Sequence, residues 1–148
     1  MRRTPAFANL LVLPLLLLTR ALCACGPSCP ATAATRAEWP TTVTSGALRV
    51  ELGANQLAQT NAGPAHLPLS WSKLGPARLV VTDDAGVVRL RQELPVQPQS
   101  TGTGEKVSLV LADASGAPLP SGLYRVAVHV GDDEASATFE IVHCALYY

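Results

Sequence analysis

The segment "GLYRVAVHVGDDEASATFEIV" (residues 122–142) shows most clearly which fold the chain adopts. Apolar residues stand at every second position from Tyr124 to Val130, and the same spacing returns from Ala137 to Ile141. A spacing of two is the side-chain period of a β-strand with one buried face. The "GDDE" between the two runs consists of residues that favour a tight turn. The segment therefore predicts two β-strands joined by a short turn.

The same alternation continues upstream and begins at Val43. The turn-rich stretches "DDAG" (83–86) and "DASGAPLPSG" (113–122) separate some of the alternating runs, and no segment has a sustained helical period. Short strands with frequent turns are typical of a β-sandwich. We expect an all-β domain over residues 43–148, a single antiparallel β-sandwich of six to seven strands. The upstream runs are residues 48–52, 67–71, 79–81, 88–94 and 107–111.

The first 24 residues have the pattern of an export signal. Two arginines precede an apolar run from Ala6 to Leu18, and small residues follow. That run is shorter than the about 20 residues that a membrane-spanning helix needs. Residues 25–42, "CGPSCPATAATRAEWPTT", are rich in Ala, Thr and Pro and show no period. We expect residues 1–24 to be removed and residues 25–42 to form a flexible tether.

The charge balance argues against two classes of partner. Loss of Arg2, Arg3 and Arg20 with the signal lowers Lys plus Arg from 11 to 8 against 11 Asp plus Glu, a net charge near −3. A mildly acidic chain without a basic run is a poor nucleic-acid binder. It is also poorly suited to electrostatic attachment to an anionic membrane. We therefore expect no nucleic-acid partner.

The end of the signal, "LCAC" (residues 22–25), resembles the lipobox of bacterial lipoproteins. The resemblance implies cleavage before Cys25, a diacylglycerol on its sulfur and an acyl chain such as palmitate on its new amine. Gly26 follows, where that family uses Asp for retention at the inner membrane, so the resemblance implies an outer-membrane anchor facing the periplasm or the surface. The alternative is ordinary cleavage after Ala21 or Cys23, which would release a secreted protein.

The remaining cysteines are expected to pair with each other. If Cys23 leaves with the signal and Cys25 carries the lipid, Cys29 and Cys144 remain in an exported domain, where disulfides are common. A Cys29–Cys144 bond would close a loop of more than 100 residues. The alternative is a free, buried Cys144 that packs as a small apolar residue.

Two stretches resemble known domains. The stretch "LPLSWSKLGPARLVVTDDAGVV" (67–88) resembles the second and third strands of fibronectin type III domains. The stretch "DASGAPLPSGLYRVAV" (113–128) is similar to bacterial immunoglobulin-like modules such as the C-terminal domain of the flagellar hook-cap protein. These resemblances imply an immunoglobulin-like fold with Trp71 in the core and Tyr124 as a tyrosine corner. Trp39 precedes Pro40 in the tether and is expected outside the core.

The sequence predicts no catalytic residue, no metal ligand and no cofactor. His66, His129 and His143 are expected at the surface or at strand ends, and no serine stands in a nucleophile-elbow motif. The Cys-x3-Cys pair has no nearby histidine to complete a metal site. The carboxylates of "GDDE" (131–134) suit a solvated turn, and a weak calcium site is the alternative.

We therefore expect a non-enzymatic envelope lipoprotein that presents one immunoglobulin-like module for binding, adhesion or assembly. Its partners would be the membrane, through the lipid anchor, and a protein or cell-wall component. Residues 95–105 and 53–66 are expected to form the partner-facing surface. The alternative function is an exported carrier of a small ligand or ion.

Overall fold

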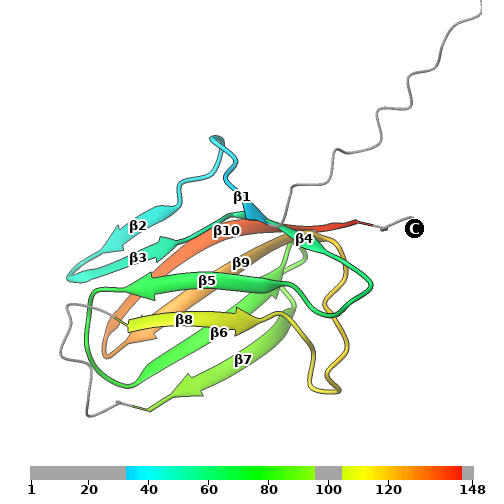
Figure 1. The fold of residues 1–148 in the computed structure, drawn as a ribbon. Coiled ribbons are helices and arrows are strands. Elements are labelled where there is room, and N and C mark those ends of the chain that lie inside the picture. The colour runs from blue at the N-terminus through cyan, green and yellow to red at the C-terminus, as the bar shows by residue number, and fades with distance from the viewer. Residues whose placement is uncertain (1–32, 96–104, 145–148) are drawn as a thin grey trace, which may run out of the picture.

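The structure, a computed structural model, describes residues 33–95 and 105–144. These residues form an all-β domain of two sheets (Figure 1). No helix in the described ranges is long and apolar enough to cross a membrane. The predicted signal peptide, Cys25 and Cys29 lie outside the described residues.

The described residues contain ten strands, more than the six to seven expected. The alternating runs of the sequence correspond to β3, β5, β6, β7, β8, β9 and β10. The extra strands β1, β2 and β4 are short, and β2 has no buried position, so its sequence lacks the apolar alternation of a half-buried strand. The strands are β1 (Ala33–Ala34), β2 (Thr42–Ser45), β3 (Leu48–Leu52), β4 (Gln56–Gln59), β5 (His66–Trp71), β6 (Ala77–Asp83), β7 (Val88–Leu94), β8 (Glu105–Val110), β9 (Gly122–Val130) and β10 (Asp133–His143).

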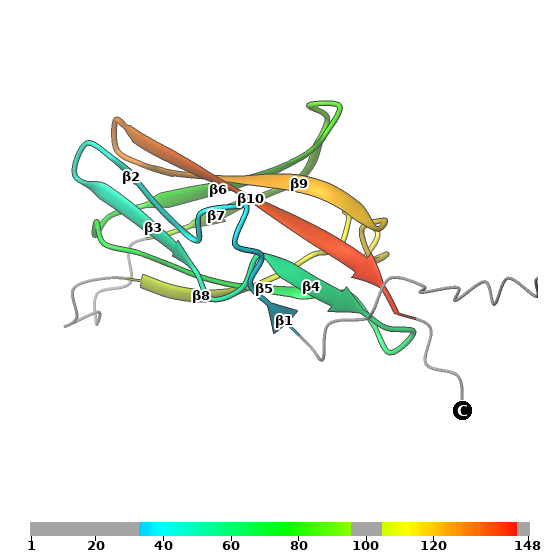
Figure 2. The ribbon, with the colours of Figure 1, turned by 90° about the horizontal axis from the view of Figure 1, so that it is seen from above.

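The strands are divided between a six-stranded sheet in the order β1-β4-β10-β9-β6-β7 and a four-stranded sheet in the order β2-β3-β5-β8. The two sheets lie one above the other (Figure 2). Every neighbouring pair is antiparallel except β4 and β10, which run parallel. The expectation of a wholly antiparallel sandwich is therefore wrong at this one pair.

The core lies between the sheets and contains the apolar residues that alternate in the sequence. In β9, the even-numbered residues from Tyr124 to Val130 are at most 5% exposed, and the odd-numbered residues face away from the core. Each strand of period two thereby gives one face to the core. The largest fully buried side chains are Phe139, Leu48, Leu57, Leu67, Leu79, Leu109, Leu111, Leu119 and Ile141.

The segment 53–66, expected to face a partner, instead contributes to the core. It contains β4, with Leu57 1% exposed, and Asn55 within it is fully buried. The stretch "NQLAQ" has only one large apolar residue, so this strand is not visible as an alternation in the sequence. The exposed residues of the segment are Gly53, Asn61, Ala62 and His66, and its role toward a partner stays a prediction.

Asn55 joins the expected tether to the sandwich. Its side chain accepts a hydrogen bond from the Arg36 amide (2.5 Å) and donates to the carbonyls of Arg36 (3.0 Å) and Trp39 (2.9 Å). These hydrogen bonds form a clamp at Asn55 that holds Arg36 and Trp39. Just before this clamp, β1 pairs with β4. A buried amide is stable only when it is hydrogen-bonded in this way. Residues 33–42 are therefore attached to the domain.

The two tryptophans have different environments, as the sequence predicts. Trp71 ends β5 and is 2% exposed, and its indole Nε1 has no hydrogen-bond partner among the described residues. Trp39 is half-buried, with the Arg36 guanidinium 4.9 Å from its ring centroid. Trp71 therefore contributes through packing in the core, while Trp39 contributes a cation–π contact near the surface.

The predicted tyrosine corner is confirmed at Tyr124. Its hydroxyl donates a 2.6 Å hydrogen bond to the carbonyl of Pro120, four residues upstream, and its ring stacks on Phe139 at 5.7 Å. Burial of this hydroxyl raises the pKa of Tyr124. The bond fixes the chain where it passes from the four-stranded sheet into β9.

Replacing Trp71 by alanine should destabilise the domain by about 3–5 kcal/mol, because it leaves a cavity in the core. Trp39→Ala is the matched control and should cost about 1 kcal/mol or less, because that ring is half-exposed. Chemical denaturation of the mature protein measures both. Equal losses for the two variants would contradict the distinction between the rings.

Tyr124→Phe should destabilise the domain by about 1 kcal/mol, because it removes the hydrogen bond to Pro120 and keeps the ring packing. The measurement is the free energy of unfolding from urea titration. An unchanged unfolding midpoint would show that the hydroxyl contributes nothing to stability.

Candidate functional site

The predicted lipidation and disulfide residues are only partly described. Cys25 and Cys29 lie outside the described residues, so the lipid anchor and the Cys29–Cys144 pair stay predictions. Cys144 follows β10, is 4% exposed, and donates its amide to the carbonyl of Gln59 at 2.8 Å. It therefore lies at the end of the sandwich where β4 and β10 finish side by side.

The histidines lie on strands, and one has a serine neighbour. His129 is partly exposed, with Nδ1 3.5 Å from Glu134, and His143 is exposed at the end of β10. His66 is exposed, and its Nδ1 lies 3.4 Å from the hydroxyl of Ser108 on β8. The sequence did not indicate this pair, because its members are 42 residues apart. No described carboxylate forms a hydrogen bond or ion pair with His66.

The "GDDE" carboxylates belong to a turn with an ion pair. Asp133 accepts a 2.8 Å hydrogen bond from Lys73, which follows β5. The same carboxylate lies against Gly46, whose φ of 57° places it in the left-handed region. Within the described ranges, no group of three or more His, Cys, Asp or Glu could hold a metal ion.

Of the two serines in the 113–122 turn, Ser115 has structural partners. Asp113 accepts hydrogen bonds from the amide (2.8 Å) and hydroxyl (2.6 Å) of Ser115 and from the amide of Ala117 (3.0 Å). These bonds, led by the one from the Ser115 hydroxyl, lower the pKa of Asp113. Ser121 is exposed in the same connection. The turn therefore holds its own shape through Asp113.

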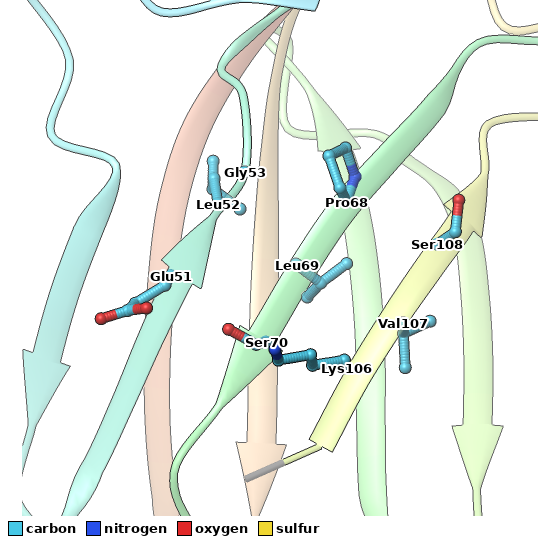
Figure 3. A pocket seen from close by; sticks show the side chains of 9 residues that line it. All are labelled: Glu51, Leu52, Gly53, Pro68, Leu69, Ser70, Lys106, Val107 and Ser108. Carbon is cyan, nitrogen blue, oxygen red and sulfur yellow. The ribbon is translucent and has the colours of Figure 1, made fainter.

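A hollow lies on the outer face of the four-stranded sheet (Figure 3). Its volume is about 440 Å³, and strands β3, β5 and β8 contribute to it. Glu51 lies on the β3 side, and the Lys106 side chain extends from β8 toward Ser70 of β5 (Figure 3). The lining residues are Glu51, Leu52, Gly53, Pro68, Leu69, Ser70, Lys106, Val107 and Ser108.

Gly53 and Pro68, which both line the hollow, approach each other closely. The amide of Gly53 donates to the carbonyl of Pro68 at 2.7 Å, and a side chain at Gly53 would come within 2.9 Å of the proline ring. Pro68 has no amide to return the bond, so pairing between β3 and β5 ends here. The two strands therefore separate beyond this point.

Strand β8 forms one edge of the hollow and the free edge of its sheet in the described chain. The amide of Leu111 donates to the carbonyl of Ala65. The backbone amides and carbonyls of the odd-numbered residues of this stretch therefore point toward β5. Backbone direction alternates along a strand, so the amides and carbonyls of Lys106, Ser108 and Val110 point away from the sheet. These groups are available to another strand.

The other edges are shorter or better protected. Strands β1 and β2 have two and four residues. Strand β7 carries exposed charges at Arg89, Arg91 and Glu93, and a β-bulge interrupts its pairing with β6. Charges and bulges are the usual protection against strand addition. Strand β8 has six residues, and Lys106 is its one exposed charge among the side chains described.

Known proteins add little to this description. No family model matches the chain, and no curated protein matches it. A solved structure of PorZ, described as an essential bacterial surface component of the type IX secretion system of Porphyromonas gingivalis, is similar with a TM-score of 0.42 and 19% identity. The match covers 63% of this chain and 11% of that chain. The similarity is distant, and no conclusion about this chain rests on it.

Gly53→Ala should destabilise the domain by about 1–3 kcal/mol, because the new methyl group would overlap the ring of Pro68. Thermal or chemical denaturation measures the loss. In a Pro68→Ala background, the same substitution should cost less, because the nearest ring atom, Cγ, is removed. Equal costs in the two backgrounds would contradict the close contact.

Proposed function

We propose that the chain is a non-enzymatic envelope lipoprotein that presents one immunoglobulin-like module to a protein or cell-wall partner. The observation that carries the proposal is the open edge of β8 beside the hollow, because an exposed sheet edge is a recurring site of protein recognition. The hollow lies on an open sheet face and contains no group of possible metal-ligating residues among those described.

The order of the later strands supports an immunoglobulin-like assignment. Strand β5 lies in the four-stranded sheet, β6 and β7 lie in the other, β8 returns, and β9 and β10 cross again. Such alternation between sheets, with a tyrosine corner where the chain enters the penultimate strand, is characteristic of this fold.

The position of the chain ends supports an anchor at one end of the sandwich. Strand β1 runs antiparallel to β4, and β10 runs parallel to it, so the N-terminal end of β1 lies at the end of the sandwich where Cys144 lies. The Cys144 side chain is buried at this end of the sandwich, and we propose that its sulfur forms a disulfide. Cys29, four residues before Ala33, is the partner we propose.

A carrier of a small ligand remains the second candidate, because the hollow of about 440 Å³ falls in the size range of ligand pockets. A soluble-ligand screen by thermal shift distinguishes the candidates. A carrier should be stabilised by its ligand in proportion to RT ln(1 + [L]/Kd), whereas a binding module should respond to a macromolecular partner.

Cys25→Ser should abolish lipid attachment and leave the domain folded. Metabolic labelling with radioactive palmitate, followed by detergent partition, measures the attachment. The wild-type protein should be labelled and enter the detergent phase, because two or three acyl chains bury enough CH₂ groups for stable anchoring. A soluble, unlabelled wild-type protein would contradict the anchor.

Cys29→Ser is the matched control, because it should keep the label and lower stability. The loss should reach at most about 4–5 kcal/mol, the chain-entropy estimate for a long loop, and should appear only under oxidising conditions. A melting temperature that is equal for wild type and variant in oxidising buffer would exclude the Cys29–Cys144 pair.

A further inference from the structure

We infer that β8 binds an extended peptide that joins the four-stranded sheet as an added strand and carries an acidic and a large apolar side chain at alternate positions. This inference rests on the proposed binding function and names the chemistry of the partner. It follows from the backbone of β8, from the three side chains that stand along its outer face, and from the hollow behind them.

The backbone of β8 supplies the first requirement, a row of unused hydrogen-bonding groups. Residues 106, 108 and 110 direct their amides and carbonyls away from β5, as the Leu111–Ala65 bond establishes. No described strand pairs with this edge. An added strand would satisfy these groups and continue the sheet, which is how peptides bind to exposed edges.

The outward side chains supply charge and apolar contact. Lys106 is exposed and forms no ion pair with any described residue, whereas Glu51 across the hollow is already paired with Arg49. A carboxylate on the added strand opposite Lys106 would form a favourable cross-strand pair. Val110 is 44% exposed and would be covered by an apolar side chain at the other end of the strand.

Ser108 lies between Lys106 and Val110 on β8, and its short side chain leaves space between their longer side chains. Its short side chain lies beside the hollow, with Pro68 of β5 opposite it in the pairing of the two strands (Figure 3). A long apolar side chain on the added strand, opposite Ser108, would extend over the hydroxyl toward the proline ring. Cross-strand neighbours lie about 5 Å apart, so such a side chain can reach the hollow.

The test measures binding of a short fluorescein-labelled peptide in which threonine alternates with glutamate, leucine and valine, in that order. Fluorescence anisotropy with the mature, folded protein gives Kd. A peptide of the same composition with these three residues placed consecutively is the control, because it breaks the period of two. Tighter binding of the alternating peptide supports the inference, and equal binding of both overturns it.

Two substitutions at Ser108 test the backbone contact. Ser108→Pro removes an amide that points away from β5, so it should leave the sheet intact and weaken peptide binding about tenfold. Ser108→Ala also removes the hydroxyl and keeps the amide, so it should bind like the wild type. Circular dichroism and melting temperature verify folding. Unchanged binding by a folded Ser108→Pro variant would overturn the inference.

The charge contact is tested by reversal. Lys106→Glu should weaken binding of the glutamate peptide about fivefold, and a peptide with lysine in place of glutamate should restore it. A loss that the lysine peptide does not restore would overturn the assignment of the acidic residue.

A second copy of the chain is the competing occupant of the edge. Light scattering that shows a dimer in the wild type and a monomer in Ser108→Pro would overturn the peptide inference. Failure of this inference is distinguishable from failure of the proposed function. If the Ser108→Pro variant is still labelled with palmitate and still cross-links to an envelope partner, only the role of β8 is overturned.

Discussion

The sandwich depends on one constraint, which is that the apolar faces of its two sheets must cover each other. In β9 and β10, alternate residues such as Val126, Val128 and Phe139 are fully buried, and their neighbours face outward. A shift of one residue in either strand would move the whole apolar set to the outside. The bond from Tyr124 to Pro120 holds the register at the point where the chain crosses between sheets. Local turn chemistry and core packing therefore support the same arrangement.

The packing of the two faces does not cover the edges of the sheets, and these edges differ in pairing and in charge. One edge of the larger sheet is extended by β4 and β1, and the buried Asn55 fastens the segment that follows β1. The opposite edge, β7, carries charges and a bulge. In the smaller sheet, the described side chains of β8 include one exposed charge, Lys106, and its described pairing shows no bulge. Because edge protection is common in natural sheets, this lightly protected edge beside a hollow is the feature that supports the proposed binding function.

The two ends of the sandwich also differ. The first described strand and the end of β10 lie at one end, where Cys144 is buried beside Gln59. At the other end, the Lys73–Asp133 ion pair joins the connection after β5 to the turn between β9 and β10, with Gly46 of a third turn against the same carboxylate. An anchor at the first end would hold the second end away from the membrane.

The sequence by itself determined the all-β class, the alternating strands and the burial of Trp71, because each depends on period two. The hydrogen bond of Tyr124 was implied by the resemblance to immunoglobulin-like modules, and it spans only four residues. Tertiary structure decided the rest. Strand β4 and the clamp at Asn55 have no periodic signal, since β4 holds one large apolar residue and the clamp joins positions far apart in the chain. The Ser108–His66 contact, the hollow and the free edge of β8 likewise depend on which strands become neighbours. Neighbour order follows from how the whole chain covers its apolar faces, and no local stretch of sequence contains that information.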